Sequence, residues 1–223
     1  EEAQRLQFQG IQPLQVDSLA AERSAGVNAD LNHSLQLSDS LSLDLNLLLF
    51  YTRVSDPLKL VEAGAGQYVY RQPVPHLDTR GAEMNAVWRW EPFKFFLGYT
   101  RADVREHQQS ETVEALLIPK DRVNMVFVYE REDDIRIGLE AYYYGRQALQ
   151  SGAKSPDYWV FGLMTEKIVT DGFSFFLNFE NFGDTRQTRD GAIFTGSQTN
   201  PEFLDIYAPL DGFVINGGVK IRF

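Results

Sequence analysis

The sequence contains no cysteine among its 223 residues, and only three of the residues are histidines. The absence of cysteine excludes a disulfide framework, a thiolate metal site and a cysteine nucleophile. The histidines, His33, His76 and His107, are far apart in the sequence, so none of them forms a pair with the spacing of a metal-binding motif. We therefore expect no metal site, and we interpret His76 and His107 as solvated loop residues.

Long apolar runs and an excess of basic residues are also missing. No stretch approaches the ~18 to 20 apolar residues of a membrane-spanning helix, and the densest run, Leu45 to Tyr51, already contains Asn46. The 21 Lys and Arg residues are outnumbered by 31 Asp and Glu residues, so the net charge is −10. Because nucleic-acid affinity comes largely from basic side chains that neutralise phosphates, this composition disfavours a nucleic-acid partner.

Catalytic signatures are absent as well. There is no Gly-x-Ser-x-Gly motif, and Gly64-Ala65-Gly66 lacks the following lysine and helix of a phosphate-binding loop. We therefore expect that the protein is not an enzyme and that it needs no cofactor.

What the sequence does contain is alternation of apolar and polar residues from one end to the other. In the last eleven residues, Phe213 to Phe223, apolar side chains lie on one face, with Gly217 the only gap, and Lys220 and Arg222 lie on the other. The same pattern predicts four pairs of antiparallel strands, at 27–38 with 41–51, 82–90 with 95–100, 123–130 with 135–146, and 158–167 with 173–182. With the closing strand the total is about nine.

The connections between these strands alternate in length. Tight turns are predicted near residues 39, 92, 133 and 171, whereas 55–75, 106–117, 148–156 and 186–211 are long and polar. Transmembrane barrels have short turns on the periplasmic side and long loops outside, and strands of about 9 to 11 residues cross the bilayer. We therefore predict an all-β fold, an antiparallel transmembrane β-barrel.

A sheet of nine strands leaves two edges, and unpaired backbone groups cannot remain in lipid. The first residues, Glu1 to Arg5, do not resemble a signal peptide and do not include an initiating Met. Residues 1–25 have the character of a loop. We expect the partner strands to lie upstream of Glu1.

Three segments resemble conserved segments of the TonB-dependent receptor family of outer-membrane transporters. Leu19 to Gly26 resembles a Leu-x-Pro-Glu-x-Ser strand opening, with Ala21 in place of Pro, and Pro119 to Asn124 resembles a Pro-x-His-x-x-Asn strand entry, with Asp121 in place of His. Asn178 to Asp184 resembles the Asn-Leu-Phe-Asp segment of the penultimate strand, with Gly183 where Phe is usual. Together with the final strand these segments follow one another in the family's order.

This resemblance implies that residues 1–223 form the C-terminal portion, about nine strands, of a barrel of about 22 strands, without the plug domain and the N-terminal strands. It also implies energy-dependent import across the outer membrane of a Gram-negative bacterium. The imported nutrient would be a metal chelate such as a ferric siderophore, haem or cobalamin. The partners would be outer-membrane lipid and the TonB complex, the latter through the absent plug.

Three other interpretations stay open. A plug-free porin or passive channel would show the same alternation. An outer-membrane hydrolase would need Ser and His on one outward strand face, where His33 is the only candidate histidine. A soluble lipocalin-like barrel would need polar outward faces, which the leucines between Leu41 and Leu49 do not provide.

Candidate substrate contacts lie at the strand ends nearest the long loops. We expect five residues to face the inside of the barrel there: Arg101, Asp103, Tyr142, Tyr144 and Arg146. Aromatic rings and guanidinium groups suit a planar or anionic chelate through stacking and paired hydrogen bonds.

Overall fold

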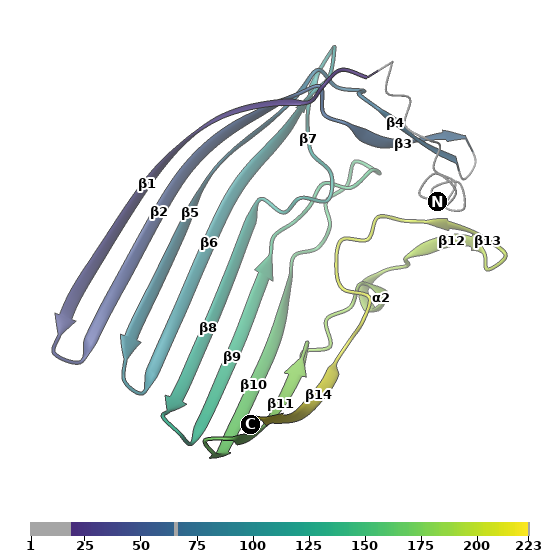
Figure 1. The fold of residues 1–223 in the computed structure, drawn as a ribbon. Helices are drawn as coiled ribbons and strands as arrows, with labels where there is room; N and C mark the ends of the chain where they lie inside the picture. The colour runs from purple at the N-terminus through teal and green to yellow at the C-terminus, as the bar shows by residue number, and fades with distance from the viewer. Residues whose placement is uncertain (1–18, 65–66, 223) are drawn as a thin grey trace. The chain divides into compact units, whose positions relative to one another are not determined.

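A computed structural model describes residues 19–64 and 67–222 of the chain (Figure 1). Of the loop predicted at residues 1–25, residues 1–18 lie outside the described residues, as does the terminal Phe223. The end of that prediction is wrong, because the first strand already begins at Arg23. The first residues described, from Leu19, lead directly into a strand.

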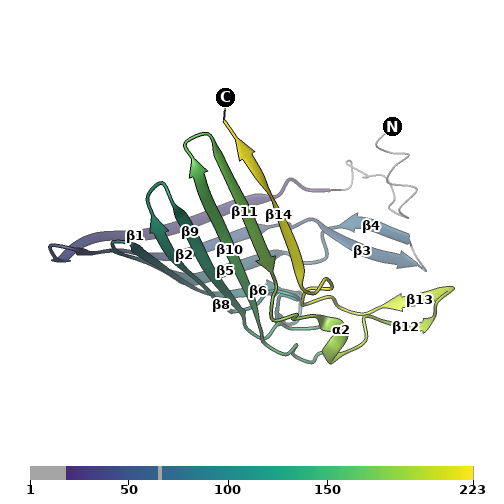
Figure 2. The ribbon, with the colours of Figure 1, turned by 90° about the horizontal axis from the view of Figure 1, so that it is seen from below.

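The main sheet is antiparallel and has ten strands, nine of which follow one another in a single path (Figures 1 and 2). The path consists of β1 (Arg23–Ser38), β2 (Leu41–Ser55), β5 (His76–Trp90), β6 (Phe93–His107), β8 (Asp121–Arg131), β9 (Ile135–Tyr144), β10 (Tyr158–Thr170), β11 (Phe173–Glu180) and β14 (Val214–Ile221). The tenth strand, β7 (Thr112–Glu114), pairs with β6. The nine strands and four tight turns expected from the alternation are confirmed.

The chain divides into two compact units, which we describe separately. The first unit comprises residues up to 28 together with 50–80 and 103–115. It holds β7, the loop-side ends of β1, β2, β5 and β6, and a small hairpin formed by β3 (Lys59–Gly64) and β4 (Gln67–Arg71). The second unit comprises 29–49, 81–102 and 116–223 and contains all four tight turns.

Cross-strand register in the second unit separates two faces of the sheet. Phe95 pairs with Phe127, Phe127 with Leu139, and Leu139 with Leu163. Because side chains alternate along each strand, these partners share one face, which we call the apolar face. Its side chains are far from buried: Phe127 is 43% exposed and Leu139 46% exposed. The opposite face, which we call the polar face, carries Glu140, Glu166, Asn178, Asn216 and Lys220.

Buried hydrophobic side chains are few among the described residues. Those below one tenth exposure are Val74, Ala86, Ala102, Val104 and Ala115. A single layer of sheet has no thick core, so backbone ladders and the two faces hold these strands together. Within residues 19–64 and 67–222, no helix has the length and apolar character needed to cross a membrane.

Three of the predicted loops contain regular structure that the alternation did not reveal. The 106–117 segment contains β7. The 55–75 segment forms the β3–β4 hairpin. The 186–211 segment forms a short helix, α2 (Gln187–Asp190), and a hairpin of β12 (Phe194–Ser197) and β13 (Asn200–Phe203). Strands of three to six residues are too short for alternation to distinguish them from polar loops.

Candidate functional site

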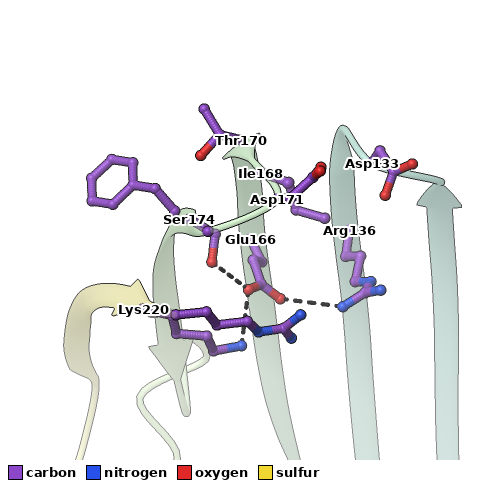
Figure 3. Close-up of a pocket in the computed structure, with 11 residues that line it drawn as sticks. Asp133, Arg136, Glu166, Ile168, Thr170, Asp171, Ser174 and Lys220 are labelled. Atoms are coloured by element: carbon purple, nitrogen blue, oxygen red, sulfur yellow. Dashed lines mark hydrogen bonds and ion pairs between the residues drawn. The ribbon is translucent and has the colours of Figure 1, made fainter.

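A carboxylate on β10 is the centre of a charged cluster on the polar face, close to the β10–β11 turn (Figure 3). Glu166 Oε1 accepts hydrogen bonds from Ser174 Oγ at 2.7 Å and Lys220 Nζ at 2.9 Å. Arg136 Nη1 lies 3.6 Å from Glu166 Oε2. These groups come from β9, β10, β11 and β14 and line a pocket of about 200 Å³. Lys220 and Arg136 pair with the negative charge of Glu166 within the cluster. We therefore interpret the cluster as a structural link between the strands.

Polar side chains are also paired elsewhere on this face. Asn178 Nδ2 donates to Asn216 Oδ1 at 3.0 Å, between β11 and β14. Arg89 of β5 forms an ion pair with Asp44 of β2. In these pairs the amide and charged groups satisfy one another's hydrogen-bonding capacity across the strands, and the face stays hydrophilic.

Two of the predicted substrate contacts, Tyr142 and Tyr144, lie on the polar face near the loop end of β9. Tyr142 Oη donates to Glu140 Oε2 at 3.1 Å. The ring of Tyr144 stacks on that of Tyr158, with centroids 5.0 Å apart and an interplanar angle of 17°. Tyr158 Oη in turn donates to the carbonyl oxygen of Tyr207 at 3.0 Å. The tyrosines therefore join the wall to the long segment between β11 and β14.

Arg146 follows β9 and has a different environment. Its side chain is 71% exposed, and its Nε lies 3.8 Å from Asp157 Oδ1. It lines a pocket with Asp121 and Tyr143, both in the phase of the apolar face. The structure therefore does not unite Arg146 with the rings of Tyr142 and Tyr144.

Arg101 and Asp103 require a correction to the expected orientation. Both are separated from Phe95 by an even number of residues along β6, so they share the phase of the apolar face. Arg101 Nη1 lies 3.0 Å from Asp121 Oδ1, which also accepts a hydrogen bond from Tyr99 Oη at 2.7 Å. The prediction placed both residues by their nearness to a long loop and did not apply the alternation that starts at Phe95. A role in substrate contact stays a prediction for all five residues.

The segment between β11 and β14 is ordered by buried polar groups. Gln187, 2% exposed, donates to the carbonyl oxygen of Asp205 at 2.7 Å and accepts from the backbone N–H of Tyr207 at 2.8 Å. Partial burial raises the pKa of Asp184, but the N–H of Phe213 and the guanidinium of Arg186 outweigh it, so the pKa lies below its ordinary value. Burial raises the pKa of Tyr207. This long connection is therefore a structured part of the loop side.

The first unit contains a cluster that we did not predict from the sequence. Arg53 donates two hydrogen bonds to Asp78, from Nε to Oδ1 at 2.7 Å and from Nη2 to Oδ2 at 2.8 Å. His107 Nε2 lies 3.0 Å from Asp78 Oδ2, and the His107 ring stacks on His76 with centroids 4.1 Å apart. Thr112 Oγ1 lies 3.1 Å from His107 Nδ1. His76 begins β5 and His107 ends β6, so neither is a loop residue.

The sequence did carry a signal for this pair. The turn at Glu91-Pro92 separates β5 from β6, and His76 lies 15 residues before Glu91 (91 − 76) while His107 lies 15 after Pro92 (107 − 92). In a regular two-residue hairpin, residues equidistant from the turn face each other. Counting outward from the predicted turn would have brought the two histidines together.

Comparison with known proteins gives a consistent family and fold. The family model described as "TonB dependent receptor-like, beta-barrel" matches residues 5–182. Comparison with curated protein sequences finds no match.

Solved structures are similar in fold. The ferric enterobactin receptor PfeA (G324V mutant) of Pseudomonas aeruginosa is 15% identical, with a TM-score of 0.64 over 93% of this chain and 32% of that one. The FrpB iron transporter of Neisseria meningitidis is 12% identical, with a TM-score of 0.62 over 92% and 31%. The ferric-catecholate import receptor Fiu of E. coli is 18% identical, with a TM-score of 0.57 over 90% and 28%. The chain thus spans 28 to 32% of the length of these structures.

Proposed function

Because the chain belongs to the TonB-dependent receptor β-barrel family, we propose that the whole protein is an active transporter of the bacterial outer membrane. In this proposal it imports a metal chelate such as a ferric siderophore, and force from the TonB complex reaches it through an N-terminal plug. Residues 1–223 supply the C-terminal portion of the barrel wall. The similar structures, which include receptors named for ferric enterobactin and ferric catecholate, support an iron chelate as the cargo.

The observation that carries the proposal is the opposite character of the two faces of one sheet. The apolar face exposes large side chains such as Phe127 and Leu139, which suits contact with lipid. The polar face carries paired groups such as Glu166 and Lys220, which suits a water-filled lumen and contact with a plug. Transport by such a wall requires binding and displacement rather than bond chemistry, so the proposal includes no enzymatic activity.

We propose Tyr142 and Tyr144 as chelate contacts, because they lie on the polar face at the loop end of β9. Arg146 has an exposed guanidinium, but it lines a pocket with Asp121 and Tyr143 rather than with these two rings, so it is not included in this contact. The strand phase gives Arg101 and Asp103 no support in this role.

The proposal is tested by measuring uptake of labelled iron in a strain from which the gene for this protein has been deleted. Restoring the full-length gene should restore uptake of a ferric siderophore, and collapsing the proton gradient of the inner membrane should abolish it. Replacing both rings, Tyr142→Ala with Tyr144→Ala, should weaken chelate binding about tenfold, because each lost aromatic contact is worth ~0.5 to 1.5 kcal/mol.

Tyr143→Ala is the matched control, since Tyr143 lies between the two on the same strand but packs against Trp159 of the apolar face, with ring centroids 5.1 Å apart. It should leave chelate binding unchanged. Uptake that persists without the proton gradient would instead identify a passive channel. Equal losses of binding in the double variant and in the Tyr143→Ala control would remove the assigned contacts.

A further inference from the structure

We propose that His76, Asp78 and His107 bind a divalent transition-metal ion directly, independently of any chelate. The three side chains each offer one ligand atom, and these atoms all lie within 4.8 Å of one another. All three residues belong to the first unit and are half-buried. No other group of three such residues is found in the part of the chain that the structure describes.

The donor set fits this class of ion. Two imidazole nitrogens and one carboxylate form the ligand set of open zinc sites and of several other divalent metals, whereas Ca²⁺ and Mg²⁺ prefer oxygen ligands alone. Bonds of ~2.0 to 2.1 Å around a tetrahedral ion require ligand atoms ~3.3 Å apart. The two imidazole rings stack nearly parallel, at an interplanar angle of 19°, so one ring has to rotate before both nitrogens face the same ion. Rotation of side chains at the ends of two adjacent strands can supply this change and the remaining adjustment of up to about 1.5 Å.

Two of the three ligand atoms are joined by a hydrogen bond in the structure. His107 Nε2 and Asp78 Oδ2 are 3.0 Å apart, so one proton lies between them. A metal ion would take the place of this proton, and the neutral ring would carry its one hydrogen on the other nitrogen. His107 would then carry its hydrogen on Nδ1 and donate it to Thr112 Oγ1, which is 3.1 Å away. This outer contact would fix the ring orientation, as outer partners of metal-bound histidines commonly do.

Arg53 both supports and limits the site. Its hydrogen bond from Nε to Asp78 Oδ1, at 2.7 Å, can remain when Oδ2 binds a metal, and it fixes the carboxylate. Its second hydrogen bond, from Nη2 to Oδ2 at 2.8 Å, competes with the ion for that atom. Its positive charge also repels a cation at that distance. The arrangement therefore predicts binding in the micromolar range rather than the very tight binding of a structural zinc site.

The test is a calorimetric titration of Zn²⁺ into the full-length receptor in detergent, after treatment with a chelator. We expect one micromolar site, which His76→Gln and His107→Gln each weaken at least tenfold. His33→Gln is the matched control, since His33 is the only other histidine of these 223 residues and lies on β1. It should leave this site unchanged.

Thr112→Val provides a second measurement that does not touch a ligand, and it should weaken Zn²⁺ binding about tenfold. Folding of each variant is checked by the different gel mobility of boiled and unboiled samples. Wild-type affinity in both histidine variants, or equal losses in the His33 control, would overturn the proposal. Because the probe is the bare ion, chelate uptake and this site can fail separately.

Discussion

At the scale of single residues, Glu166 of β10 contacts side chains on three other strands of the sheet. Its carboxylate meets Ser174, Lys220 and Arg136, and its side chain is only 15% exposed. The two cations are each more than half exposed, so solvent screens both ion pairs. The value of the cluster lies in joining separate strands at the turn side more than in the strength of any one pair.

Replacing the charge while keeping the shape isolates this contribution. Glu166→Gln retains an acceptor for Ser174 but loses both ion pairs, and we expect it to lower the free energy of unfolding by about 1 kcal/mol. The measurement is thermal loss of the folded, unboiled gel form of the full-length protein. Glu132→Gln, which removes the same charge from an exposed turn residue, should have no effect; an equal loss there would indicate an effect of net charge alone.

At the scale of elements, the closing strand contains a glycine that close packing requires. Gly217 lies opposite Leu177 of β11. A Cβ atom added at Gly217 would lie 2.9 Å from the carbonyl oxygen of Phe176 and 3.2 Å from Leu177 Cδ1. The one gap in the apolar alternation of the last strand is thus a point of close approach between backbones.

Gly217→Ala should therefore destabilise the pairing of β11 with β14. We expect a loss of about 1 to 3 kcal/mol, the usual range for an overpacked site, measured as a lower midpoint of urea unfolding of the full-length protein. Gly191→Ala is the control, because a Cβ atom there would meet no heavy atom within 4 Å. Equal stability of the two variants would show that the strands can separate to accommodate the methyl group.

Long strands were predictable because they contain many alternating apolar and polar residues, and a longer pattern is harder to confuse with a loop. β5 and β6 each extend over 15 residues, and their phase and turn follow directly from the sequence. The β12–β13 hairpin, with strands of four residues, carries too little pattern to detect. The histidine cluster was missed for another reason: it depends on register across a hairpin, which appears only when residues are counted from both sides of the turn.

At the scale of the whole molecule, the two ends of the strand path have consequences for assembly. Within the described residues, β1 pairs only with β2 and β14 only with β11. Each therefore presents a row of N–H and C=O groups on its other side, and such groups cost several kcal/mol each in hydrocarbon. Pairing with further strands removes this cost, and under the proposed function the remainder of the barrel would supply these strands.

We therefore expect these 223 residues, expressed alone and refolded in detergent, to associate or aggregate through β1 and β14. The full-length protein should instead be a monomer whose unboiled form migrates faster than its boiled form. Size-exclusion chromatography with light scattering distinguishes the two outcomes. Adding the remainder of the barrel as a separate polypeptide should restore the compact form, since it satisfies both edges. A monodisperse, heat-resistant monomer of the short chain would contradict this view, because the strands would then have to satisfy their own edges.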